Sequence, residues 1–352
     1  MSAVSYKCPG CGGDLRFDPD TQECKCEYCL SSFTVPDLES RNNMEEVIND
    51  ASKNTPDYSA EMVEYSCPSC GAVIVTDTTT SATFCIYCHN PVVIPQQVAG
   101  EFRPAKVIPF KLKREDAIDK LNAWCKKKWF LPRDFRSQKQ LDMVKGVYLP
   151  YWLVDFNTKS QLSAEGRIVT SWRVGDYQYT KTDRYSVQRS ADMALLNIPH
   201  DASSKADDKL MDSIEPFDYN ETKDFSMSYL SGFLAEKYDV PSDQIIPVLK
   251  ERATKVVHSE LSGSLRSERP YTSVSERGFF VDFKSADACY ALLPIWMVTY
   301  LYNGKTFMYV INGQTGKASG ILPISRGKLA LLFGIVAAVT FAAAWIGGTL
   351  LL

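Results

Sequence analysis

The longest uninterrupted apolar stretch of the chain covers residues 329–352 and contains no charged side chain. As a helix it would extend over about 36 Å, which is enough for the hydrocarbon core of a bilayer. The pattern therefore predicts a transmembrane helix. The alternative is a buried helix of a globular domain, although such a helix ordinarily has a polar face. Arg326 and Lys328 precede the stretch, and positive charges flank membrane helices on the cytoplasmic side. We expect a C-terminal tail anchor in the cytoplasmic membrane, with the soluble part in the cytoplasm.

Shorter patterns predict the elements of a middle domain over residues 102–325. Bulky and aromatic runs predict strands at 146–156 and 289–300, and a further strand-rich stretch covers 165–189. Asn303 followed by Gly304 is typical of a type I′ hairpin turn, and another turn is expected at 312–316. Apolar residues at helical spacing predict helices, at residues 114–135, 225–238 and 242–256. The fold class is therefore α+β.

The first and second predicted strands share the pattern Leu-Pro-x-Trp, at residues 149–152 and 293–296. This repetition suggests that the middle domain consists of two related halves. The basic, Trp-containing helix at 114–135 has two interpretations. It could lie on an anionic membrane surface, or it could pack its apolar face on the core with its lysines in solvent, which we favour.

Cysteines occur in two groups with the same spacing. Each group has two Cys-x-x-Cys pairs separated by fourteen residues, and the second group follows the first by 59 residues. Two residues between cysteines allow one turn to aim both thiolates at one metal ion, and four thiolates are typical of a structural zinc site with no open position for water. We predict two zinc ions in two zinc ribbons, at residues 1–36 and 65–95. The eight expected ligands are Cys8, Cys11, Cys26, Cys29, Cys67, Cys70, Cys85 and Cys88.

Some features of these sites stay open at the level of sequence. Cys24 could replace Cys26 as a ligand, but its equivalent in the second group is Thr83, which favours Cys26. Iron could occupy the same four-sulfur cage. His89 has no histidine equivalent in the first group and is interpreted as a surface residue. The polar and acidic residues 37–64 predict a short helix and a linker, across which the ribbons could move relative to each other.

The balance of charge changes the expected function of the ribbons. The chain has 352 residues, which is long enough for two or three domains. Its net charge is −3, and 45% of its residues are hydrophobic, as in ordinary globular proteins. Residues 1–36 contain more acidic than basic side chains, and residues 60–100 contain no Lys or Arg. Phosphate contacts dominate nucleic-acid affinity. The ribbons are therefore expected to bind protein rather than nucleic acid.

Motifs of catalysis are not recognisable, and we expect that the protein is not an enzyme. The segments NGKT (303–306) and GQTGK (313–317) lack the spacing of a phosphate-binding loop. His89, His200 and His258 have no nucleophile motif beside them, and Cys125 and Cys289 are expected to be small buried residues. The first residues, MSAVSYKCPG, do not have the apolar centre of a signal peptide.

The order of these features resembles a bacterial family, the TFIIB-type zinc-ribbon-containing membrane proteins. The resemblance rests on the two CPxCG ribbons, the C-terminal apolar helix and three segments: GVYLPYWLVDF (146–156), SYLSGFLAEKYDV (228–240) and ALLPIWMVTYLYNGKTFMYVINGQTGKASG (291–320). Some members are encoded beside a phage-shock protein A homologue and an SPFH, flotillin-like protein. The resemblance thus implies a membrane-stress assembly in which this protein is the adaptor or scaffold that recruits such partners. The alternative is a membrane-tethered regulator that binds nucleic acid or RNA polymerase. Some members of this family are labelled primosomal helicases. This sequence has no recognisable nucleotide-binding motif and gives that label no support.

Overall fold

The computed structural model confirms the α+β class and divides the chain into two compact units. Unit 1 contains residues 1–149, 205–237 and 292–352, and unit 2 contains residues 150–204 and 238–291. Side chains are described over most of both units, and for residues 342–350 only the backbone is described. The described ranges are 5–42, 62–71, 73–85, 90–99, 102–126, 128–132, 135, 137 and 141–350.

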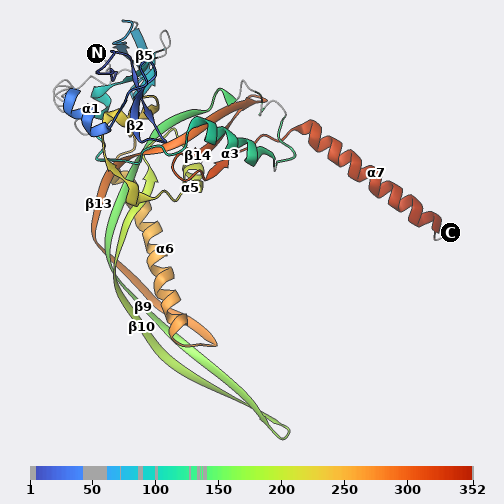
Figure 1. Ribbon diagram of the computed structural model, residues 1–352. Helices are drawn as coiled ribbons and strands as arrows, with labels where there is room; N and C mark the ends of the chain where they lie inside the picture. Colours follow the sequence, from blue (N-terminus) through green and yellow to red (C-terminus); the bar gives the residue numbers. More distant parts are fainter. Residues whose placement is uncertain are drawn as a thin grey trace. The chain divides into compact units, whose positions relative to one another are not determined.

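The first ribbon is a small three-stranded antiparallel sheet followed by a helix (Figure 1). Its elements are β1 (Leu15–Asp18), β2 (Glu23–Cys26), β3 (Ser32–Phe33) and α1 (Val35–Asn42). The second ribbon has two antiparallel hairpins. They are formed by β4 (Met62–Ser66) with β5 (Val73–Asp77), and by β6 (Thr80–Phe84) with β7 (Pro91–Val93). The short helix expected after the first ribbon is α1, and the rest of the expected linker lies mostly outside the described residues.

The second ribbon joins the main sheet of unit 1. Strand β6 pairs antiparallel with β12 (Leu234–Glu236), and β12 pairs parallel with the beginning of β9 (Lys145–Val174). The sheet continues through β13 (Ser273–Tyr302) to two short strands, and β14 extends it from β13. These further strands are β8 (Lys106–Val107), β11 (Lys223–Asp224), β14 (Lys305–Asn312) and β15 (Ala318–Gly320). Strands 146–156 and 289–300 are thus confirmed as parts of β9 and β13, and positive φ angles at Asn303 and Gly304 confirm the type I′ turn.

Among the described residues, the remaining elements are short helical turns and longer helices. The short elements are η1 (Pro95–Val98), α5 (Asp208–Ser213), η4 (Tyr219–Glu221) and η5 (Met227–Leu230). The longer helices are α3 (Arg114–Lys126), α6 (Ser242–Glu268) and α7 (Arg326–Leu350). Helix α3 ends at Lys126, short of the expected residue 135, and leaves Trp129 outside the helix and exposed. It buries Ala117, Leu121 and Cys125, as the core-facing interpretation expects.

One predicted helix is wrong. Residues 225–238 form the 3₁₀ turn η5 and the strand β12, separated by Gly232 with a φ of 93°. A helix cannot continue through this left-handed residue. The segment instead satisfies its backbone by pairing with β6 and β9. The expected helix at 242–256 is present and extends to Glu268.

Helix α7 coincides with most of the predicted membrane anchor. In the part of the chain with described side chains, no helix is both long and apolar enough to cross a membrane. The predicted span 329–352 reaches beyond that part, because the side chains are described only to Phe341.

Unit 2 is built from a long antiparallel hairpin, with part of β13 paired to β9 and one helix packed on these strands. Strand β9 pairs with β10 (Tyr177–Asp201) across a two-residue turn at Gly175 and Asp176. Helix α6 packs on this hairpin through two buried clusters. The first cluster comprises Val154, Phe156, Ala202, Ile245, Leu249 and Ala253, and the second comprises Leu162, Ala164, Val187, Val257, Leu261 and Leu265.

The two Leu-Pro-x-Trp segments have equivalent surroundings in their respective units. Trp296 Nε1 donates a hydrogen bond to the Leu112 carbonyl at 3.0 Å, and Trp152 Nε1 donates one to the Val240 carbonyl at 2.9 Å. Each acceptor lies two residues before a helix, α3 or α6. An aromatic ring two residues before each acceptor also contacts the tryptophan, with centroids 5.1 Å and 5.0 Å apart.

The correspondence extends to the backbone and to the helices. The Pro294 carbonyl accepts the Gly313 N–H at 2.8 Å, and the Pro150 carbonyl accepts the Ala202 N–H at 2.9 Å. Both helices bury residues five, nine and thirteen positions after the tryptophan-bonded carbonyl. These residues are Ala117, Leu121 and Cys125 in α3, and Ile245, Leu249 and Ala253 in α6. The recurrence supports the hypothesis of two related halves.

Candidate functional site

The first ribbon presents its cysteines on two knuckles that have the same backbone bonds. The Gly12 N–H donates to the Cys8 carbonyl at 2.8 Å, and the Leu30 N–H donates to the Cys26 carbonyl at 3.0 Å. Gly12 and Leu30 each follow the second cysteine of their pair and have φ angles of 74° and 62°. The left-handed residue lets each chain turn away immediately after the cysteine pair, which leaves both sulfurs on the inner side of the turn.

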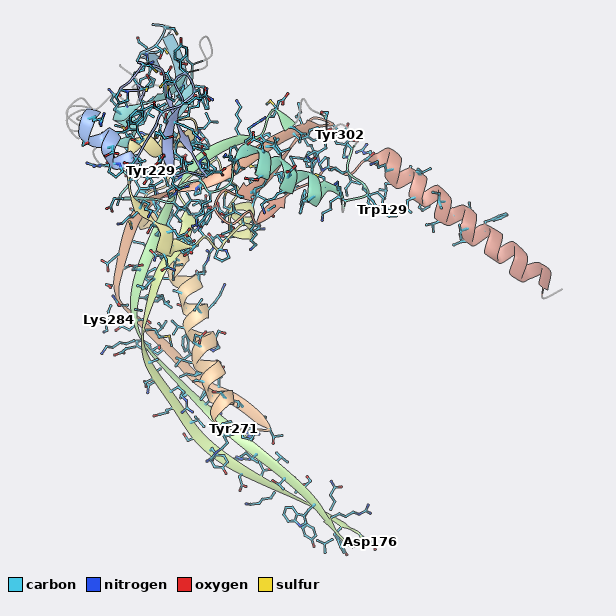
Figure 2. All side chains as sticks on the ribbon, in the orientation of Figure 1. Trp129, Asp176, Tyr229, Tyr271, Lys284 and Tyr302 are labelled. Carbon is cyan, nitrogen blue, oxygen red and sulfur yellow. The ribbon has the colours of Figure 1, made fainter. Side chains whose placement is uncertain are left out.

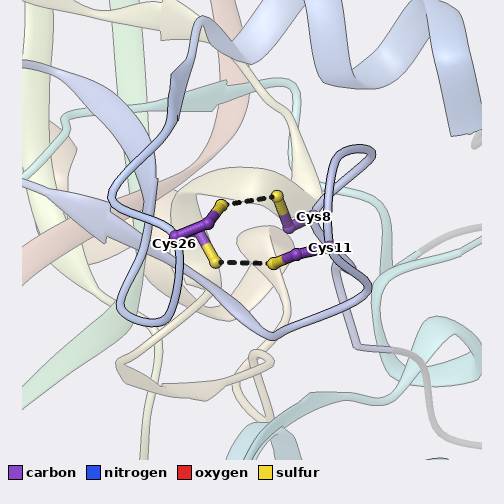
Figure 3. A group of neighbouring side chains, drawn as sticks. Cys8, Cys11 and Cys26 are labelled. Carbon is purple, nitrogen blue, oxygen red and sulfur yellow. Dashed lines mark hydrogen bonds between the residues drawn. The ribbon is translucent and has the colours of Figure 1, made fainter.

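The two knuckles bring four sulfur atoms together (Figure 3). The Sγ atoms of Cys8, Cys11, Cys26 and Cys29 lie within 4.8 Å of one another, and the pairs Cys8–Cys29 and Cys11–Cys26 are each 3.5 Å apart. A tetrahedral zinc ion with Zn–S bonds of about 2.3 Å has sulfur atoms about 3.8 Å apart, whereas a disulfide requires about 2.0 Å. The spacing therefore fits a tetrahedral metal site that small movements of the thiols would complete.

The electrostatics of this cluster also favour a bound cation. A hydrogen bond with the Ser31 hydroxyl, followed by one with its backbone N–H, lowers the pKa of Cys29 to about 6. For Cys11, a hydrogen bond with the backbone N–H of Gly13 lowers the pKa of the thiol. The neighbouring thiols raise this pKa, and the net result is a value of about 12. Four thiols this close cannot all ionise alone, because each thiolate opposes ionisation of the next. A divalent cation would remove that repulsion.

Cys24 lies on strand β2 but outside the cluster, with its side chain turned into the core towards Ser228. Its side chain is fully buried, and its Sγ lies 3.8 Å from the carbonyl oxygen of Ser228. Burial raises the pKa of its thiol to about 12. A buried neutral thiol is a poor metal ligand. The structure therefore places Cys26, and not Cys24, with the other three cysteines.

The second ribbon repeats the first knuckle. The Gly71 N–H donates to the Cys67 carbonyl at 2.9 Å, and Gly71 has the same φ of 74° as its counterpart. The Sγ atoms of Cys67, Cys70 and Cys85 lie within 4.8 Å of one another, with Cys70 and Cys85 separated by 3.7 Å. Cys88 and His89 lie outside the described residues. These three cysteines could hold a second metal ion.

The basic side chains of the first ribbon are engaged with carboxylates. Lys7 pairs with Asp14, Arg16 with Glu27 at 3.4 Å, and Lys25 with Asp18 at 3.2 Å. Lys7, Arg16 and Lys25 are the three basic residues of positions 1–36. Contacts to phosphate would have to displace these pairs.

The first ribbon also packs on another segment of unit 1. Ser231 forms two bonds with strand β1: its carbonyl accepts the Phe17 N–H at 3.0 Å, and its hydroxyl donates to the Leu15 carbonyl at 2.5 Å. The Phe17 ring meets that of Tyr229 edge to face at 5.2 Å. The strand and η5 together bury Cys24. A metal ion that orders this ribbon would therefore also stabilise its contact with residues 228–231.

A feature that the sequence did not reveal lies at the end of the β9–β10 hairpin, beyond the buried clusters beneath α6. Every residue from 169 to 182 is exposed. Trp172 lies opposite Tyr179, and Val174 lies opposite Tyr177, on one face of the ribbon. The Trp172 and Tyr179 rings stack with centroids 5.8 Å apart. We name these four residues the tip face; Tyr177, its most exposed member, has 73% of its surface accessible.

The opposite side of the same hairpin end is polar. Ser171 lies opposite Thr180 and bonds to it at 3.2 Å, and Arg173 lies opposite Gln178. Apart from Val169 at the base of this segment, which is 40% exposed on the polar side, the large apolar side chains are therefore gathered on one side of a narrow ribbon. The alternation of apolar and polar residues was visible in the sequence. Locating the exposed aromatic face also required the pairing register of β9 with β10 and the position at which helix α6 ends. Figure 2 labels Asp176 at the turn beside it.

The described residues with nucleophilic or basic side chains do not form a catalytic arrangement at the positions considered from sequence. His258 Nε2 and the Ser262 hydroxyl each bond to Glu276, at 2.8 Å and 3.0 Å, rather than to each other. Cys125 is buried as expected, whereas Cys289 is only partly buried.

Comparison with known proteins identifies a full-length relative. The chain is 37% identical over 340 residues to the uncharacterized protein YdjG of Bacillus subtilis (strain 168). The aligned region covers 97% of this chain and 96% of the relative. No family model and no solved structure matches the chain.

Proposed function

The chain belongs to the same family as the uncharacterized protein YdjG of Bacillus subtilis, and on that premise we propose that it is a membrane-anchored adaptor that recruits other proteins. The observation that carries this proposal is the tip face at the end of the β9–β10 hairpin. An isolated two-stranded ribbon is marginally stable in water, and exposed aromatic clusters are typical of protein interfaces. A partner protein that covers the tip face would bury its apolar surface.

The chemistry of the ribbons supports a structural role in this adaptor. We propose one zinc ion in each ribbon, held by Cys8, Cys11, Cys26 and Cys29 in the first, and by Cys67, Cys70, Cys85 and Cys88 in the second. Four thiolates leave no coordination position for a substrate. Each ion would supply folding energy to a module too small for an extensive core. No step of a reaction is assigned to either metal centre.

The composition of the last helix supports the proposed membrane location. We assign α7 and the two following residues as the anchor, with Arg326 and Lys328 at its cytoplasmic end. The described part of α7 exposes large apolar side chains that a bilayer would cover. These side chains are Leu329, Leu331, Leu332, Phe333, Ile335, Val336, Val339 and Phe341.

The resemblance to the TFIIB-type zinc-ribbon membrane proteins supports a choice of partner class. We propose that the partners are an SPFH, flotillin-like protein and a phage-shock protein A homologue at the cytoplasmic membrane. The alternative function, a membrane-tethered regulator of nucleic acid or RNA polymerase, is favoured only by the ribbon motif. The paired cations of the first ribbon oppose it.

The experiment is affinity capture of the full chain from detergent-solubilised membranes, followed by mass spectrometry. The test variant replaces residues 169–182 with Asn-Gly, which closes Ile168 and Asp183 with a type I′ turn. The matched control exchanges the polar side of the tip, with Ser171→Ala and Thr180→Ala. We expect SPFH-type or phage-shock-type partners with the wild type and the control, and their loss from the shortened hairpin. Partners that persist without the tip, or recovery of polymerase or nucleic acid, would contradict the proposal.

A further inference from the structure

An apolar cavity of about 390 Å³ lies in unit 1 just before α7. It is formed by residues 128–131, which follow α3, and by residues 322–324. Lys128 contributes the one charged side chain of the lining, and the other side chains are apolar or aromatic. Its volume is within the range of about 300–1,000 Å³ that is typical of small-ligand pockets.

Hydrogen bonds connect the two walls of this cavity. The Ser325 N–H donates to the Phe130 carbonyl at 2.8 Å, and Lys328 Nζ donates to the Leu131 carbonyl at 2.7 Å. The first bond is a main-chain contact between the wall after α3 and the residues that lead into α7. These two bonds hold the segment after α3 against the residues that lead into α7.

The rim of the cavity combines an aromatic side chain with positive charge. Trp129 is 81% exposed and lies near the beginning of α7, as Figure 2 shows. Lys128 lines the opening, and Arg326 and Lys328 belong to the first turn of α7. Tryptophan and cationic side chains are characteristic of the membrane–water interface, where rings meet the headgroup region and cations meet anionic lipid.

We propose that this cavity is a binding site for an anionic phospholipid, an inference that rests on the proposed membrane anchoring. One acyl chain lies between residues 128–131 and 322–324, and the lipid phosphate contacts Lys128 and Arg326. Three features select this occupant: apolar walls, cations on the lining and in the first turn of α7, and a place in the chain immediately before this apolar helix. The site gives the adaptor a preference for anionic membrane regions, which an apolar helix alone does not provide.

Native mass spectrometry of the full chain in detergent micelles tests this site, with phosphatidylglycerol and phosphatidylcholine added separately. We expect phosphatidylglycerol adducts to be retained preferentially. Since each cation near an anionic lipid contributes about fivefold, the double variant Lys128→Gln and Arg326→Gln should reduce that preference by about 25-fold or abolish it. A variant with Trp129→Ala and Ile324→Ser, both exposed positions, should weaken retention of both lipids.

The control removes two exposed charges elsewhere, with Lys209→Gln on α5 and Lys255→Gln on α6, and should retain the preference. Equal retention of the two lipids, or an equal effect of the control, would overturn the lipid site. Flotation of the wild-type chain with phosphatidylcholine vesicles tests the anchor separately. Flotation without a lipid preference in micelles would reject the cavity and retain the anchor, whereas failure to float would reject the anchor whatever the micelle result.

Discussion

Cys24 and Cys26 are separated by one residue on strand β2, yet their surroundings give them different chemistry. Cys26 lies at the strand end, where the second knuckle begins, and its Sγ is 3.5 Å from that of Cys11. Cys24 is buried against Ser228. Sequence spacing favoured Cys26 through the internal repeat, and the structure supplies the physical reason.

The first prediction concerns the metal content of these two variants. Cys26→Ala should lower the bound metal by one equivalent per chain, because it removes one of four sulfurs. Cys24→Ala should keep the metal and cost about 1 kcal/mol of stability, a usual value for a single substitution. Elemental analysis of the full chain, with denaturant unfolding, measures both effects. Loss of metal from Cys24→Ala and not from Cys26→Ala would reverse the assignment.

A second prediction concerns Glu165 in unit 2. Hydrogen bonds from Arg277 at 2.5 Å and Arg167 at 2.7 Å lower the pKa of its carboxyl group to about 2. The ordinary value of about 4.5 applies in the unfolded chain. The contribution to stability is therefore complete above that value and is lost as the pH falls towards 2.

The measurement for Glu165 is hydrogen exchange of unit 2 between pH 5 and pH 2.5. Glu165→Gln should make protection of the β9–β10 hairpin near Arg167 less dependent on pH than in the wild type. Glu260→Gln, at an exposed position of α6, should leave that dependence unchanged. The same pH dependence in all three proteins would show that the ion pairs do not contribute.

At the scale of elements, helices α3 and α6 have equivalent positions after equivalent tryptophan-bonded segments. Each buries a stripe of residues four positions apart, and Leu121 and Leu249 occupy the middle of these stripes. A spacing of four residues keeps side chains on one helix face. The buried stripe accounts for much of the stability expected from each helix.

A third prediction therefore concerns α6. Leu249 is fully buried, whereas the neighbouring Val248 is half exposed. Leu249→Ala should destabilise unit 2 by about 2–5 kcal/mol, because it leaves a cavity, and Val248→Ala should cost about 0.5 kcal/mol or less. Hydrogen exchange of the β9 and β10 amides reports the loss. Similar effects of both substitutions would contradict the packing of α6 on the hairpin.

Elements with local signals could be predicted from the sequence, and those fixed by distant pairing could not. The knuckles, the Asn303–Gly304 turn and the two Leu-Pro-x-Trp strands depend on neighbouring residues. The helix expected at 225–238 failed because its pattern competes with strand pairing to β6 and β9. The tip face was missed because exposure there depends on where α6 ends, at Glu268, and a strand pattern alone does not contain that information.

At the scale of the whole molecule, the metal centres and the tip face belong to different units. Both cysteine clusters lie in unit 1, which also contains α7, whereas the tip face lies in unit 2. The grouping differs from the expected series of ribbon, linker, ribbon and middle domain. Two contacts explain this grouping. Strand β6 joins the second ribbon to the main sheet, and residues 228–231 bind the first ribbon. Under the proposed function, metal would stabilise the unit that contains α7, and the other unit would bind the partner.

The fourth prediction tests this account most directly, by cross-linking in living cells. A photoactivatable phenylalanine analogue replaces Tyr177 on the tip face, and in a control it replaces Phe280, which is also exposed in unit 2. The account predicts that position 177 becomes linked to an SPFH-type or phage-shock-type protein and that position 280 does not. Cross-links from position 177 to RNA polymerase or nucleic acid, or the same products from both positions, would contradict the adaptor function.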